Sequence, residues 1–118
     1  YKGKINIIAI SSNDVINYPQ DSPKMMKKMA IDKKFNFPYL YDESQNVAKS
    51  FDAACTPDFF LYDKNLSLFY RGRYDKSRPN NNEKLNALDL NEAFNYMIEN
   101  KEFTNTQYPS LGCNIKWK

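Results

Sequence analysis

Apolar residues alternate between strand-like and helix-like spacing along the chain, which predicts an α/β order of elements. Residues 4–10 form a β-branched run followed by a turn-prone polar segment, and this predicts a largely buried strand in a sheet covered on both faces. Ser22 as N-cap and Pro23 at the first helical position then predict the start of a helix. Three methionines are expected to form the core face of that helix: Met25, Met26 and Met29.

A short strand and a second helix are predicted next. The segment 35–42 is too aromatic and too proline-broken for a helix, so it predicts a short strand. Residues 44–51 predict a second helix, whose expected buried face consists of Val47, Ala48 and Phe51.

The second half of the chain predicts a hairpin, a last helix and a tail. Strands at 59–62 and 66–71 are joined by residues 63–65, where Asn65 suits the left-handed backbone of such a turn. Residues 77–82 predict a polar loop, and residues 104–118 predict a tail packed across the body of the domain.

The last helix is expected over residues 87–100. Its apolar positions repeat at helical spacing: Leu90, Phe94, Met97 and Ile98. Asn86 and Asp89 have the spacing of a capping box at its start.

Length and charge limit the class of protein. With 118 residues and 42% hydrophobic content, residues 1–118 predict one domain with a single core. The net charge of +3 comes from lysines interleaved with acidic residues, so nucleic acid is not an expected partner. The lysines among residues 24–34 are expected to form the solvated face of the first helix. Apolar runs are much shorter than the roughly 20 residues that span a bilayer, so we expect a cytoplasmic protein without a membrane partner.

The chain contains no histidine, which removes the usual general base and the commonest metal ligand. Its two cysteines, Cys55 and Cys113, are widely separated and cannot form a standard zinc site without histidine. The sequence therefore predicts neither a metal site nor a cofactor.

Cys55-Thr56-Pro57-Asp58, directly before an apolar run, is the strongest candidate for chemistry. Proline fits the first residue of a strand, and an X-Pro bond can be cis at modest cost, so a tight turn would present Cys55 and Thr56 at a surface edge. The alternative is that Cys55 is a small buried hydrophobic residue.

The order of elements is that of the second half of a thioredoxin fold, and five separated segments resemble one branch of that superfamily. The branch is the peroxiredoxin-like one, grouped with alkyl hydroperoxide reductase and thiol-specific antioxidant proteins. The segments are residues 8–14, 37–45, 53–63, 70–73 and 112–118.

This resemblance implies an α/β, thioredoxin-like fold with a mixed sheet and flanking helices. It also implies that the first core strand and the redox helix, with the primary redox cysteine, lie upstream of Tyr1, so we predict an N-terminally truncated chain. A sheet edge left open by the missing strand predicts self-association.

The resemblance further implies that Pro57 is cis and that Thr56 offers backbone groups to a bound thiol or peptide substrate. Cys55 is then a candidate resolving thiol or disulfide partner. Cys113 is a candidate partner of Cys55 or of the missing cysteine, and a buried structural thiol is the alternative for both. Arg71 and Arg73 form a basic pair that either favours a nearby thiolate or is solvated.

Two classes of function are consistent with these residues. The first is a thiol-dependent oxidoreductase that performs thiol–disulfide exchange or peroxide reduction with the help of a protein reductant, and that is inactive as this fragment alone. The second is a noncatalytic thioredoxin-fold binding module, because a fold does not determine a function.

Overall fold

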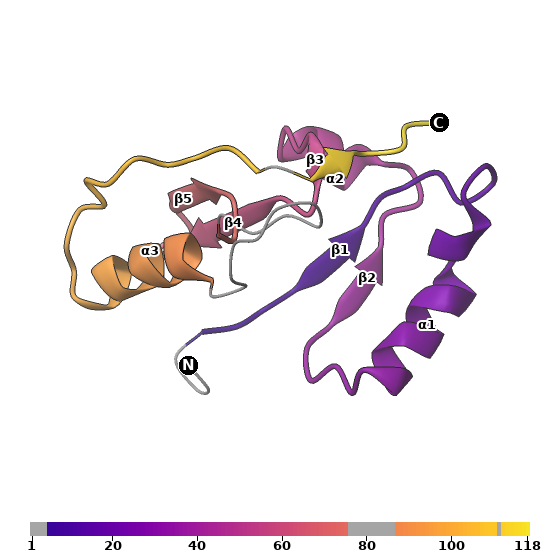
Figure 1. Cartoon of the computed structure of the whole chain (residues 1–118), viewed down its shortest axis with the longest axis horizontal. Helices are drawn as coiled ribbons and strands as arrows, with labels where there is room; N and C mark the ends of the chain where they lie inside the picture. Colours follow the sequence, from indigo (N-terminus) through magenta and orange to yellow (C-terminus); the bar gives the residue numbers. More distant parts are fainter. Residues whose placement is uncertain (1–4, 76–86, 111) are drawn as a thin grey trace. The chain divides into compact units, whose positions relative to one another are not determined.

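The computed structural model describes residues 5–75, 87–110 and 112–118 (Figure 1). The chain divides into two compact units, residues 1–53 with 115–118, and residues 54–114. The described strands pair two by two into three small sheets, instead of the single mixed sheet that the sequence predicts.

The first unit is built on a parallel pair of strands, β1 (Ala9–Ser11) and β2 (Tyr39–Tyr41). A short 3-10 helix, η1 (Pro19–Asp21), leads into α1 (Pro23–Asp32), which packs beside β2. Helix α2 (Asn46–Ser50) follows β2 after a short loop (Figure 1). The predicted order of strand, helix, strand and helix is confirmed for this unit.

Helix α1 begins where the sequence predicts. Pro23 is its first residue, and the Ser22 side chain caps it by accepting a hydrogen bond from the Met25 N–H at 3.3 Å. Of its methionines, however, Met26 is buried whereas Met25 and Met29 are exposed. The prediction of a three-methionine core face is wrong because a two-stranded sheet offers a helix only a narrow surface to cover.

One face of the parallel sheet is open. Ile10 and Leu40 are register partners and therefore share a face, and they are 43% and 49% exposed. Ile8 is also exposed, so the prediction of a strand buried on both faces is wrong for the described residues. In α2 only Ala48 is buried, while the other two residues of its predicted core face are exposed: Val47 and Phe51.

The second unit contains the hairpin β4 (Phe59–Tyr62) and β5 (Leu68–Gly72), and helix α3 (Leu88–Ile98). Its other two strands, β3 (Cys55–Thr56) and β6 (Cys113–Asn114), pair with each other (Figure 1). The predicted tail therefore contains a short strand.

The hairpin turn is held by Asp63 rather than by an asparagine in a left-handed conformation. The Asp63 carboxylate accepts hydrogen bonds from the backbone N–H groups of Asn65 (2.8 Å) and Ser67 (3.0 Å). The left-handed residue is Leu66, with φ of 61°. The positive φ therefore lies at Leu66, one position after the predicted Asn65.

The start of α3 also differs from the prediction. Ala87 occupies the N-cap position and donates its N–H to the buried Asp75 carboxylate at 2.8 Å. Asn86, the expected cap, and the predicted loop at 77–82 lie outside the described residues. Asp89 forms an ion pair with Arg73 at 2.6 Å.

Tyr70 is the central side chain of the second unit. It is 1% exposed, and its hydroxyl donates to the Arg73 carbonyl at 2.7 Å. The Phe103 ring makes edge contacts with both Tyr70 and Tyr96. Ala93 and Phe94 of α3 complete this core. The aromatic contacts explain why the segment after α3 stays close to the hairpin although it contains no helix.

We expect the stability of the second unit to fall at alkaline pH through Tyr70. Burial raises the pKa of Tyr70 from 10.0 to about 12, with Asp89 adding to the effect and Arg73 opposing it. The pKa of Tyr70 is higher in the folded chain than in the unfolded chain. The stability that this difference contributes is therefore complete below pH 10 and is lost as pH rises through about 12.

The urea midpoint of the wild-type chain should therefore fall more steeply between pH 10 and 12 than that of Tyr70→Phe. Tyr62→Phe, at an exposed position, is the control and should behave as the wild type; parallel profiles for Tyr70→Phe and wild type would contradict the assignment.

Candidate functional site

The loop Cys55-Thr56-Pro57-Asp58 connects β3 to β4. The Thr56–Pro57 peptide bond is cis, in agreement with the expectation from the sequence. Thr56 and Pro57 are exposed, whereas Cys55 is half-buried. The loop thus presents Thr56 and Pro57 to solvent, next to a partly covered thiol.

The pairing of β3 with β6 brings both cysteines to this loop. The strands are antiparallel, with Cys55 opposite Asn114 and Thr56 opposite Cys113. Because neighbouring residues of a strand point to opposite faces, Thr56 shares a face with Cys113, and Cys55 lies on the other face. Both thiols are free. A disulfide needs Cβ atoms that point toward each other, so this register does not favour a Cys55–Cys113 bond.

Gly112 makes the pairing possible. A Cβ atom built on Gly112 would collide with the Thr56 carbonyl group, which is backbone and cannot move aside easily. Any larger residue would therefore push β6 away from Thr56. No local signal in the sequence marks this glycine, because the constraint comes from Thr56, a residue far away in the chain.

A cavity of about 230 Å³ lies behind the loop, within the second unit. It is lined by Ala54, Cys55, Asp58, Arg71, Gly72, Gln107, Pro109 and Ser110. The Asp58 side chain is 5% exposed and accepts hydrogen bonds from Arg71 Nη2 (3.2 Å) and Ser110 Oγ (2.8 Å). Asp58 thereby connects the end of the loop to β5 and to the segment that leads to β6.

The two predicted arginines have different positions. Arg71 pairs with Asp58 and lines the same cavity as Cys55, with its guanidinium 5.0 Å from the centre of the Phe60 ring. Arg73 pairs with Asp89 and is largely covered. The interpretation as a solvated arginine is therefore wrong for Arg73, whereas the Arg71 side chain is 36% exposed and pairs with Asp58 at the cysteine loop.

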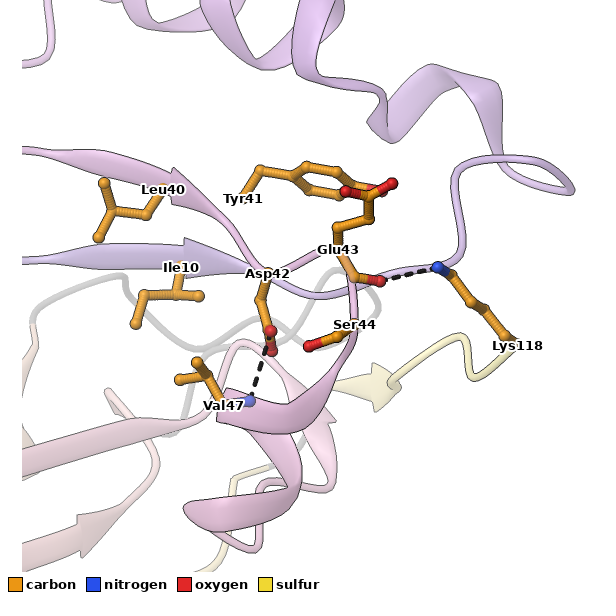
Figure 2. Close-up of a pocket in the computed structure, with 8 residues that line it drawn as sticks. All are labelled: Ile10, Leu40, Tyr41, Asp42, Glu43, Ser44, Val47 and Lys118. Atoms are coloured by element: carbon orange, nitrogen blue, oxygen red, sulfur yellow. Dashed lines mark hydrogen bonds between the residues drawn. The ribbon is translucent and has the colours of Figure 1, made fainter.

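A second pocket, of about 650 Å³, lies in the first unit at the carboxyl ends of β1 and β2 (Figure 2). It is lined by Ile10, Leu40, Tyr41, Asp42, Glu43, Ser44, Val47 and Lys118. Its apolar side is the open face of the parallel sheet. The Lys118 ammonium closes one end by donating to the Glu43 carbonyl at 2.8 Å, as Figure 2 shows.

Asp42 is the buried polar centre of this region. Its carboxylate accepts hydrogen bonds from Ser12 Oγ (2.8 Å) and from the N–H groups of Val47 (3.3 Å) and Ala48 (2.9 Å). Burial by itself would raise the pKa of Asp42, but these bonds, together with one from the Gln45 N–H, lower it below 3.8. Asp42 therefore acts as the cap of α2 and is occupied by structural bonds. Its position after a strand and before a helix was the signal that sequence reasoning missed.

The described residues contain no group of three or more cysteine or acidic side chains that could hold a metal ion. Within the same part of the chain, the helices are too short or too polar to cross a membrane.

Fold and site together are those of an α/β protein of the thioredoxin-like class. The sequence profile of the AhpC/TSA family matches residues 2–71, more than half of the chain. The chain belongs to the AhpC/TSA family, which is peroxiredoxin-like.

Solved structures similar to this chain include two bacterial proteins. An uncharacterized conserved protein from Geobacillus kaustophilus is 49% identical, with a TM-score of 0.92, over 96% of this chain and 60% of its own length. A hypothetical protein, SMc02350, from Sinorhizobium meliloti 1021 is 42% identical, with a TM-score of 0.96, over 100% of this chain and 65% of its own length.

Among the curated proteins, none matches this chain. The chain spans less than two thirds of both solved structures, at 60% and 65% of their lengths.

Proposed function

We propose that the complete protein is a thiol-dependent oxidoreductase of the peroxiredoxin-like type, which performs thiol–disulfide exchange or peroxide reduction. The observation that carries the proposal is that the β3–β6 pairing places both free thiols beside the exposed Thr56–Pro57 loop. The chain that carries this loop belongs to the AhpC/TSA family. Thr56 and Pro57 contact the substrate, and Cys55 and Cys113 are the candidate reactive thiols.

The chemistry requires one thiolate and one resolving thiol. In disulfide exchange the thiolate attacks one sulfur, the S–S bond breaks, and the other sulfur leaves as a thiolate. With a peroxide, the thiolate attacks one oxygen, the O–O bond breaks, and a sulfenic acid forms while the leaving hydroxide or alkoxide takes a proton from solvent to become water or an alcohol. A second thiol then condenses with the sulfenic acid and releases water. A protein reductant restores the two thiols.

We place the primary redox cysteine in a part of the complete protein outside residues 1–118. Two observations support this placement: the two cysteines of the chain lie on opposite faces of the β3–β6 pair, and the solved relatives extend well beyond the matched region. Residues 1–118 alone should therefore show no turnover. Among the described residues the β1–β2 sheet has only two strands, so its unpaired edges also support a further strand or a second copy of the chain beside it. A cytoplasmic location fits free thiols and remains part of the proposal.

A noncatalytic binding module is the second candidate. It is favoured by the same opposite-face arrangement, because Cys55 and Cys113 do not point toward each other as a disulfide requires.

Oxidation of the complete protein separates the two candidates. The complete protein, its Cys55→Ser variant and its Cys113→Ser variant are reduced and then treated with one equivalent of a peroxide or of a chromogenic disulfide. We expect the complete protein to form a new disulfide, and we expect that disulfide to be lost in the variant that lacks the resolving thiol. Residues 1–118 alone are the control and should show no turnover. Thiols that stay reduced in the complete protein would support the binding module instead.

A further inference from the structure

The cavity behind the cysteine loop brings a thiol and a cation together. Cys55 and Arg71 both line this space of about 230 Å³, and every residue that lines it belongs to the second unit. Ligand pockets commonly measure roughly 300–1,000 Å³, so a cavity of this size suits a group of a few heavy atoms. Its size therefore favours a small molecule over a peptide or a protein surface.

Arg71 is held in one orientation beside this space. Its Nη2 lies 3.2 Å from the Asp58 carboxylate, and its guanidinium lies 5.0 Å from the centre of the Phe60 ring. Its backbone N–H donates to Gln107 Oε1 at 3.1 Å. A cation that is fixed before a ligand arrives loses little side-chain entropy when the ligand binds.

The charge that faces an entering molecule is that of Arg71. The Asp58 side chain is 5% exposed, whereas the Arg71 side chain is 36% exposed. Asp58 is covered by its two donors, Arg71 and Ser110. A molecule in the cavity therefore meets the guanidinium rather than the carboxylate. A planar guanidinium is suited to a carboxylate ligand, which it can bind through two parallel hydrogen bonds.

Cys55 is a free, half-buried thiol at the same cavity. Cys113 lies on the opposite face of the β3–β6 pair, so the group that reaches Cys55 through the cavity is not Cys113. A small molecule that carries both a carboxylate and a reactive sulfur would match the two groups on the cavity wall.

We propose that Arg71 makes this cavity selective for small disulfides that carry a carboxylate, and that Cys55 forms a mixed disulfide with one half of such a molecule. The carboxylate lies against the Arg71 guanidinium while the Cys55 thiolate attacks one sulfur. The S–S bond breaks, and the other half leaves as a thiolate that takes a proton from solvent. Arg71 is then the specificity-determining residue. This inference rests on the proposed function in one respect, the assignment of Cys55 as a reactive thiol.

The test measures mixed-disulfide formation by intact mass on the full chain with Cys113→Ser, in which Cys55 is the only cysteine. Three small disulfides are compared: anionic dithiodipropionate, neutral hydroxyethyl disulfide and cationic cystamine. Each rate is divided by that of an unstructured cysteine peptide with the same reagent. We expect the anionic disulfide to react about tenfold faster than the neutral one on this scale, and the cationic one to react slowest, because the contact with Arg71 is a charge-assisted hydrogen bond.

Substitution of Arg71 tests its role directly. Arg71→Gln should bring the three normalised rates close to one another, because the cavity loses its exposed cation. Arg71→Lys keeps the charge but loses the planar fork, so it should retain part of the preference. Lys64→Gln is the matched control. It removes one positive charge at an exposed turn of the same unit and should leave the preference at the level of the parent chain.

Equal normalised rates for the three disulfides in the parent chain would overturn the proposal, as would a preference that survives Arg71→Gln or a Cys55 that reacts with none of them. The comparison in the parent chain decides even if Arg71→Gln does not fold, because it needs no substitution at Arg71. Failure of the proposed redox function would appear separately, as a complete protein that forms no disulfide between its own cysteines while the charge preference of Cys55 persists.

Discussion

Replacement of Gly72 by alanine is expected to lower the free energy of unfolding of the unit formed by residues 54–114 by about 2–3 kcal/mol. Gly72 is buried at the end of β5, and a Cβ atom built there would collide with the Tyr108 carbonyl oxygen and stand 3.0 Å from the Tyr70 hydroxyl oxygen. Neither neighbour can yield easily. The Tyr108 carbonyl accepts a hydrogen bond from the Arg73 N–H at 3.0 Å, and the Tyr70 hydroxyl is bonded within the core.

The consequence extends to the cysteine loop. Gly72 lines the cavity behind Cys55, and its carbonyl oxygen is 2.8 Å from Ser110 Oγ. A displaced segment around Tyr108 would therefore also loosen Ser110 and the strand that follows it.

Thermal unfolding followed by far-ultraviolet circular dichroism measures this effect. A loss of about 2 kcal/mol corresponds to a fall in melting temperature of roughly 8–16 °C for a unit of this size. Ser67→Ala, at an exposed position just before β5, is the control and should melt within about 2 °C of the wild type. A Gly72→Ala chain as stable as this control would refute the close approach of Tyr108.

Asp42→Ala is expected to destabilise the first unit by about 2–4 kcal/mol at pH 7. The substitution removes the acceptor of the Ser12 hydroxyl and of two N–H groups at the start of α2, and all three donors then lie next to an apolar methyl group. Since burying a polar donor without a partner is costly, the effect should exceed that of losing an exposed helix cap.

The size of this effect should depend on pH. Because the folded pKa of Asp42 is lowered, its contribution is present above the unfolded pKa and is lost as pH falls below about 4 through the folded pKa. The difference between wild type and Asp42→Ala should therefore shrink between pH 4 and pH 2.

Urea unfolding followed by the fluorescence of Trp117, the lone tryptophan, reports on this unit. Glu43→Gln is the control, because this neighbouring residue is exposed and only its carbonyl takes part in a described hydrogen bond. A constant difference between wild type and Asp42→Ala from pH 7 to pH 2 would show that Asp42 is not an ionised acceptor.

Local signals in the sequence were sufficient for the helices, the hairpin and the parallel strands, but not for the short strands β3 and β6. The Ser22 cap and Pro23 predict the start of α1, since both act within one helical turn. The hairpin and the short strand β2 are confirmed for the same reason. The five segments that resemble peroxiredoxin-like proteins led to the family that the profile match establishes.

Burial was harder to predict from local patterns. The pattern indicates which residues are apolar, but the described two-stranded sheet is too narrow to cover Met25 and Met29 of α1, and Leu40 lies on the open face of that sheet. An apolar residue becomes a core residue only when another layer covers it, and the sequence of a helix does not contain that layer.

The sequence by itself determined the family, the order of most elements and the identity of the cysteine loop. The tertiary structure alone decided that Cys55 and Cys113 point to opposite faces, that Gly112 lies against Thr56, and that the segment after β6 is anchored at Lys116. The reason is distance along the chain. A cap or turn joins residues within a few positions, whereas the bond from Gln45 to Lys116 joins residues 71 positions apart, and only the folded chain defines which such pairs meet.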